Sequence, residues 1–82
     1  MRIYVPLCQW LRGGMFATYT LSFAKLEQII GFPLPDSARN RSAWWANENA
    51  PTRHVQCEAW LDAGFKVAHV DPHQQIVEFQ QF

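Results

Sequence analysis

Glycine and proline interrupt this chain so closely that it can form only short helices and strands. Gly13–Gly14, Gly31, Pro33, Pro51 and Gly64 divide the 82 residues into brief segments. Glycine commonly ends a helix, and proline cannot continue within one. A chain of this length has room for one hydrophobic core, so we expect residues 1–82 to form a single domain.

Four of these segments carry the end signals or the periodicity of helices. Pro6 suits the first turn of the first helix, and Ser22 is expected to cap the second. Asp36 or Ser37 is expected to cap the third, which could continue into the following residues or break into a loop. Thr52 is expected to cap the fourth. The helical segments are 5–14, 23–30, 35–41 and 52–64, and the buried residues expected in the last are Val55, Ala59, Trp60 and Ala63.

The remaining segments favour strands. Residues 15–21 (MFATYTL) are rich in β-branched and aromatic side chains, and residues 65–70 and 76–80 alternate around a turn expected at 71–74. The sequence therefore predicts an α+β fold, with three to four short helices and a small antiparallel sheet of about three strands that includes a C-terminal β-hairpin. This element order is winged-helix-like, so the helix over 53–63 would be the recognition helix.

Charge and cysteine content limit the classes of function. Seven basic and seven acidic residues cancel, which argues against a protein held only by non-specific attraction to phosphate. Cys8 and Cys57 are far apart in apolar helical patterns, so we expect two buried, reduced thiols. No segment has the length of a signal peptide's apolar region or of a membrane span, and we expect a cytoplasmic protein with no membrane partner.

The segment from Leu34 to Asn49 is the strongest candidate for a functional surface. It places two adjacent tryptophans between arginines and asparagines. Arginine contacts phosphate or guanine, asparagine offers a bidentate amide, and an exposed indole stacks on a base or on a partner's side chain. The candidate residues here are Ser37, Arg39, Arg41, Trp44, Trp45 and Asn47.

A structural interpretation of the same segment is equally open. One tryptophan would lie in the core and the other would be half-buried, because two consecutive helical residues cannot both point inward. Arg39 would stack on an indole and Asn47 would cap a turn. The two interpretations are compatible, since one indole could remain available for binding.

A second group of candidates opens the helix before the hairpin. Arg53 and His54 lie in its first turn, where a recognition helix makes base contacts, and Gln56 follows. A cation at this end is unfavourable for the helix dipole, which favours a functional role. The alternative is an ordinary solvated helix start.

Metal binding and catalysis are not expected. His69 and His73, with Asp71 between them, could ligate a metal, but His69 is expected in a strand and His73 in a tight turn, and no further strong ligand follows at regular spacing. Ser37, His54, Cys57, Glu27 and Asp62 include possible catalytic groups, yet no motif with a known mechanism contains them. We expect Glu27 to be a helix residue paired with a basic side chain, and we expect no cofactor.

Four motifs resemble those of a family of small bacterial domains of unknown function. They are S-F-x-x-L/I-E-x-I-I-G, L-P-x-S-A-R, W-W-x-N and A-W-L-x-A-G-[FW], and together they extend over about three quarters of the chain. The resemblance supports the division into segments and implies no activity. The residues that carry it are Ser22, Phe23, Leu26, Glu27, Ile30, Gly31, Leu34, Pro35, Ser37, Ala38, Arg39, Trp44, Trp45, Asn47, Ala59, Trp60, Leu61, Ala63, Gly64 and Phe65.

Two functions follow as expectations. The first is a non-enzymatic domain that binds nucleic acid, with DNA favoured. The contacts expected are those of Arg39, Arg41, Arg53, His54 and Gln56, with Trp44 or Trp45 completing the surface and the hairpin turn at 71–74 reaching duplex DNA. The second is a small protein-binding regulator or inhibitor, of the kind that phages and mobile elements direct against host defence complexes, using an exposed Trp/Arg patch. A homodimer is a further possibility, formed through exposed tryptophan or through an edge strand ending at Phe82.

Overall fold

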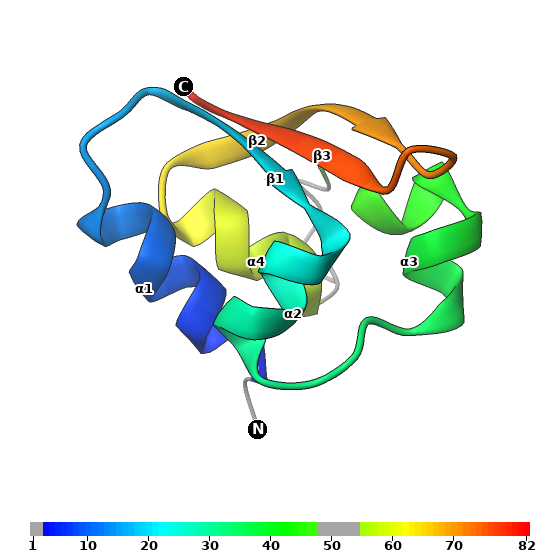
Figure 1. Cartoon of the computed structure of the whole chain (residues 1–82). Coiled ribbons are helices and arrows are strands. Elements are labelled where there is room, and N and C mark those ends of the chain that lie inside the picture. The colour runs from blue at the N-terminus through cyan, green and yellow to red at the C-terminus, as the bar shows by residue number, and fades with distance from the viewer. Residues whose placement is uncertain (1–2, 48–54) are drawn as a thin grey trace.

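The computed structural model describes residues 3–47 and 55–82 of the chain, and its elements alternate between helices and strands (Figure 1). In chain order they are α1 (Val5–Gly13), β1 (Thr18–Ser22), α2 (Phe23–Ile30), α3 (Asp36–Asn40), the 3₁₀ helix η1 (Ser42–Trp45), α4 (Val55–Asp62), β2 (Phe65–Asp71) and β3 (Ile76–Gln81). The predicted α+β fold, with its winged-helix-like element order and C-terminal hairpin, is confirmed.

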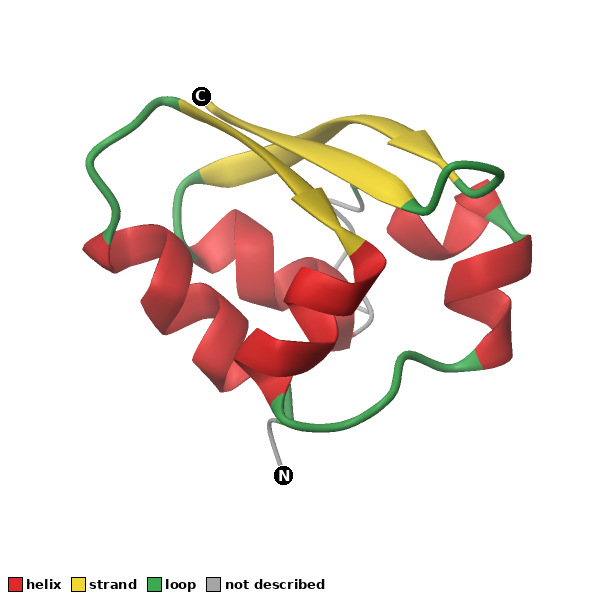
Figure 2. Ribbon diagram, viewed as in Figure 1, coloured by secondary structure: helices red, strands yellow, loops and turns green. Residues whose placement is uncertain are grey.

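The three strands form one antiparallel sheet in the order β1-β3-β2. β1 pairs with β3 from Thr18 opposite Gln80 to Ser22 opposite Ile76. Helices α1, α2 and α4 lie against one face of this sheet, and α3 lies at one end, beside the β2–β3 turn (Figure 2). The fold is therefore two layers, with the core between the sheet and the helices.

Aromatic side chains fill this core. Trp60, Phe23 and Phe79 are fully buried, and Trp60 packs against Phe79 with ring centroids 5.7 Å apart. Large rings bury much apolar area per residue, which offsets the poor surface-to-volume ratio of a short chain.

Two helix boundaries follow directly from the sequence. The Ser22 hydroxyl accepts a hydrogen bond from the Lys25 N–H at 3.0 Å, as predicted for the cap of α2. Gly31 ends α2 with a φ of 84°, a left-handed conformation that favours glycine.

Some predicted details were wrong. The first strand begins at Thr18, since the Phe16 N–H donates to the Tyr19 hydroxyl and Met15 and Phe16 are exposed. Neither Asp36 nor Ser37 caps α3, because the extended residue Pro35 occupies the N-cap position.

Two more corrections concern the C-terminal half. Val55 was expected to be buried but is exposed. The buried residues of α4 begin at Gln56, which the sequence did not predict to be in the core. The hairpin turn follows Asp71, one residue later than predicted, because Asp71 still pairs with Ile76. The expected cap Thr52 lies outside the described residues.

Cys8 and Cys57 do not form a disulfide. Cys57 is buried as expected, whereas Cys8 is only half-buried, contrary to the expectation of two buried thiols. Within the described ranges, no helix is long and apolar enough to cross a membrane.

Candidate nucleic-acid interface

The second tryptophan of the adjacent pair is a core residue. Trp45 is 2% exposed and stacks on Phe23 and Trp60, with ring centroids 5.2 and 6.0 Å away. Its indole N–H donates to the Ala38 carbonyl at 2.9 Å, which joins η1 to α3. A buried Trp with its N–H satisfied in this way holds the fold together and offers no surface to a ligand.

Trp44 lies at the edge of the same cluster. It is half-buried, and its ring meets Trp45 edge-on at 4.7 Å and Tyr4 at 5.9 Å. The prediction that one indole of the pair lies in the core and the other is half-buried is therefore confirmed. Part of the Trp44 ring remains accessible.

Asn47 connects η1 to the sheet. Its side-chain amide donates to the Val67 carbonyl at 2.8 Å and its oxygen accepts from the Val67 N–H at 2.9 Å. The same oxygen accepts from the indole N–H of the fully buried Trp60 at 3.0 Å. Asn47 thus bonds both backbone groups of one strand residue and does not cap a turn.

Gln56 is also committed to the interior. It is buried, and its amide donates to the Trp44 carbonyl at 3.3 Å. Both side-chain amides are therefore engaged within the fold: Asn47 bonds Val67 and Trp60, and Gln56 bonds Trp44.

Glu27 holds the loop between α2 and α3. Its carboxylate accepts the Leu34 N–H at 2.7 Å and forms a hydrogen-bonded ion pair with Arg39. The predicted pairing of Glu27 with a basic residue is confirmed, and Arg39 does not stack on an indole. The hydrogen bond from the Leu34 N–H, together with Arg39, lowers the pKa of the Glu27 carboxyl.

This ion pair predicts a pH dependence of stability. Because the pKa of Glu27 is lower in the folded chain, its contribution is present above the ordinary carboxyl range and is lost as the pH falls through the folded pKa. We expect Glu27→Gln to lose stability near neutral pH and to differ less from the wild type in acid. Urea unfolding at several pH values measures this difference, and a gap independent of pH would contradict it.

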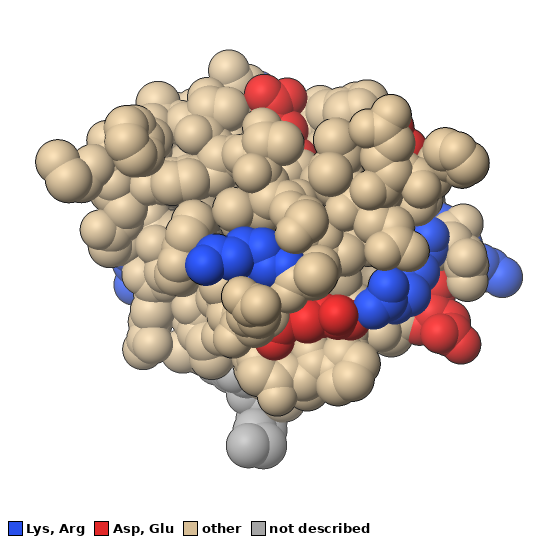
Figure 3. All heavy atoms as spheres, viewed as in Figure 1, with Lys and Arg blue, Asp and Glu red and all other residues tan. Residues whose placement is uncertain are grey.

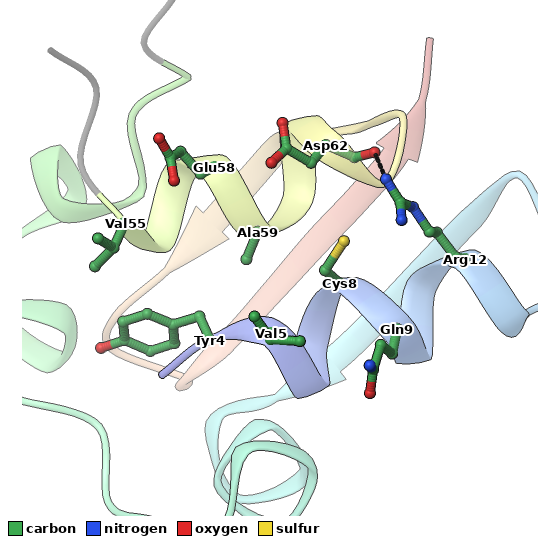
Figure 4. Close-up of a pocket in the computed structure, with 9 residues that line it drawn as sticks. All are labelled: Tyr4, Val5, Cys8, Gln9, Arg12, Val55, Glu58, Ala59 and Asp62. Carbon is green, nitrogen blue, oxygen red and sulfur yellow. Dashed lines mark hydrogen bonds between the residues drawn. The ribbon is translucent and has the colours of Figure 1, made fainter. Parts of the chain in front are cut away.

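A groove of about 160 Å³ runs between α1 and α4. Arg12 crosses it and donates to the Asp62 carbonyl at 2.8 Å (Figure 4). The Cys8 side chain points toward α4, whereas the carboxylates of Glu58 and Asp62 point away from α1. The groove lining therefore holds the Cys8 thiol on the side of α1 and these two carboxylates on the side of α4 that faces away from it.

A larger, open and polar hollow of about 440 Å³ lies between α3 and the β2–β3 turn. It is lined by Arg39, Asn40, Pro72, His73 and Gln75. Residues that carry a guanidinium, an imidazole and two side-chain amides thus line the hollow, from two elements that are distant in sequence. Arg41, which is exposed, follows Asn40 directly in the sequence at the end of α3.

The turn that forms one wall of this hollow is well supported. The Asp71 carboxylate accepts the His73 and Gln74 N–H groups at 3.0 and 3.2 Å. Gln75 has a φ of 58°, and its carbonyl accepts the Phe23 N–H at 2.8 Å. The hairpin tip is therefore fixed relative to α2.

Charges on the face that Figure 3 shows are few, and positive groups lie next to negative ones. The pairing of Arg39 with Glu27 is one such contact. In the described ranges, no three His, Cys, Asp or Glu side chains gather closely enough to hold a metal ion.

Comparison with known families assigns the chain to one of them. A family model described as "Domain of unknown function (DUF7662)" matches residues 4–81. The chain belongs to the DUF7662 family. Neither the curated proteins nor the solved structures yielded a match to this DUF7662 domain.

In the structure of this DUF7662 domain, the site residues predicted from the sequence fall into two sets. Trp45, Asn47 and Gln56 hold the fold, while Ser37 and Arg41 are exposed on or beside α3, and Arg39 and Trp44 are half-buried. Arg53 and His54 lie outside the described residues. Asn40 and Gln75 were missed because their proximity depends on how α3 meets the hairpin, which no local pattern encodes.

Proposed function

We propose that this domain binds nucleic acid without catalysing a reaction, through the surface that α3 and the β2–β3 turn form together. The observation that carries the proposal is the hollow that Arg39 and Asn40 of α3 line together with His73 and Gln75 of the β2–β3 turn. Guanidinium and amide groups of this kind bind phosphate oxygens and base edges. DNA is the favoured ligand because a hairpin tip follows a helical layer in winged-helix order.

This proposal places the contact on α3 and the turn, and not on the described part of α4. One side of α4 faces the core, and its buried residues are Gln56, Cys57, Ala59 and Trp60. The carboxylates of Glu58 and Asp62 point outward from it (Figure 4), and negative charge opposes approach to phosphate.

The small number of cations sets the expected strength. Two arginines, Arg39 and Arg41, are available for about two phosphate contacts, although Arg39 also pairs with Glu27. A plot of the logarithm of the binding constant against the logarithm of the salt concentration should therefore have a slope of about −2. Removing Arg41 should weaken binding roughly tenfold at low salt and reduce this slope by about 1.

The test is fluorescence anisotropy of labelled mixed-sequence duplex DNA with the wild type, Arg41→Ala and Lys66→Ala. Lys66→Ala is the matched control, since it removes one exposed positive charge from β2 at the end away from the hairpin turn. We expect the control to bind within about twofold of the wild type. Equal weakening by both variants would place the contact elsewhere, and no binding to DNA or RNA at low salt would favour the protein-binding alternative.

A further inference from the structure

The two edges of the sheet differ in how they are protected. β3 is the central strand, so the strand that precedes Phe82 is not an edge, contrary to the expectation from sequence. The Phe82 N–H also donates to the Gly64 carbonyl at 3.1 Å. Among the strands of the described residues, β1 and β2 are the two with an outer side on which another strand could pair.

The edge at β2 is blocked. The Asn47 amide occupies both the N–H and the carbonyl of Val67, in the way that a neighbouring strand would. A bulge follows between Val67 and His69, and the exposed Lys66 precedes it. An irregular, charged and occupied edge resists pairing with another chain.

In the part of the chain that the structure describes, the edge at β1 lacks all three of these features: a side chain bonded to its backbone, a bulge and a charged residue. Its sequence, Thr-Tyr-Thr-Leu-Ser, contains no charged residue and no proline, and its pairing with β3 is regular from Thr18 to Ser22. Exposed edges of this kind are the ones that pair with further strands.

The hydrogen-bond pattern shows which backbone groups are available. Ala17 accepts from the Gln81 N–H at 2.7 Å, and the Phe23 N–H donates to the Gln75 carbonyl at 2.8 Å. Because antiparallel residues alternate between bonding inward and outward, the N–H and carbonyl groups of Thr18 and Thr20 point away from β3. The side chains of both threonines are exposed.

We propose that β1 pairs with β1 of a second copy of this chain, antiparallel, about a two-fold axis at Thr20. In this register Thr18 lies opposite Ser22 of the second copy, and the two sheets become continuous. A second copy fits because the strand is self-complementary: two uncharged β1 strands meet without repulsion, and the formal net charge of the chain is zero. The inference does not depend on the nucleic-acid surface.

The residues before β1 provide apolar area for the same contact. Met15 and Phe16 are 94% and 71% exposed. In the register about Thr20, these two residues, which come before Thr18, approach the end of the second copy's β1 and the start of its α2. Pairing would therefore remove side chains from water that the single chain leaves exposed.

The first test is sedimentation equilibrium of the wild type and of Thr20→Pro. Proline removes the outward N–H of Thr20 but none of the bonds between β1 and β3, and proline is tolerated at such edge positions. The two-fold axis doubles the loss, so the dissociation constant should rise at least about thirty-fold. Thr20→Val retains the backbone N–H and should dimerise like the wild type; circular dichroism checks that both variants are folded.

A second test identifies the axis without proline. Thr20→Lys and Thr20→Glu place like charges opposite each other in a dimer, so each variant alone should be monomeric. Their mixture places opposite charges together and should restore the dimer. A monomeric wild type at high micromolar concentration would overturn the proposal, and so would a dimer that Thr20→Pro leaves unchanged or a mixture that stays monomeric.

Discussion

Trp45→Ala is expected to lower the free energy of unfolding by about 3–5 kcal/mol, most of the stability that so small a domain has. The substitution empties the space between Phe23 and Trp60 and leaves the Ala38 carbonyl without the indole N–H. Urea unfolding followed by far-ultraviolet circular dichroism measures the effect. We expect this variant to be partly unfolded even without denaturant.

Trp44→Ala is the matched control for this prediction, since the same side chain is removed one residue earlier. Trp44 is half-buried, so its removal should cost about 1–2 kcal/mol. Equal losses for the two variants would contradict the division of the pair into one core residue and one peripheral residue. Iodide should correspondingly quench an indole in Trp45→Phe more readily than in Trp44→Phe.

Asn47→Ala is expected to cost about 2–4 kcal/mol, far more than an exposed asparagine normally contributes. It removes three hydrogen bonds, two to the Val67 backbone and one to Trp60. The Trp60 indole N–H is the most costly of the lost partners, because it belongs to a fully buried side chain that loses its acceptor.

Two variants test the cause of this loss by urea unfolding. Asn47→Asp retains an oxygen for Trp60 and the Val67 N–H but sets a second oxygen against the Val67 carbonyl, so it should be intermediate. Asn40→Ala removes an exposed asparagine from α3 and should change stability by less than about 0.5 kcal/mol. An Asn47→Ala variant as stable as Asn40→Ala would show that these bonds contribute nothing.

Local signals in the sequence were enough to predict most of the fold. Ser22 and Gly31 mark the ends of α2 because capping depends on only a few neighbouring residues. The alternation in β2 and β3 likewise predicts the hairpin. The start of β1 could not be predicted, because Met15 and Phe16 have strand propensity and only the contact of Tyr19 with the backbone of Phe16 shows where pairing begins.

The candidate site was less predictable. Asparagine and glutamine are residue types common on binding surfaces, which is why Asn47 and Gln56 were candidates. The sequence cannot show that their amides form hydrogen bonds inside the fold, with Val67, Trp60 and the Trp44 carbonyl. These contacts join residues between 12 and 20 positions apart. Such partners depend on packing of the whole chain, whereas composition describes only what each side chain could do.

The central position of β3 has a consequence for how the chain folds during its synthesis. β1 and β2 each pair with β3 and not with each other, and β3 comes latest of the three in the sequence. While the ribosome is still making β3, both earlier strands lack their neighbour, and Val77 and Phe79 are missing from the core. We therefore expect the helical layer to remain loosely packed on the nascent chain, and the sheet to close in one step once β3 has left the exit tunnel.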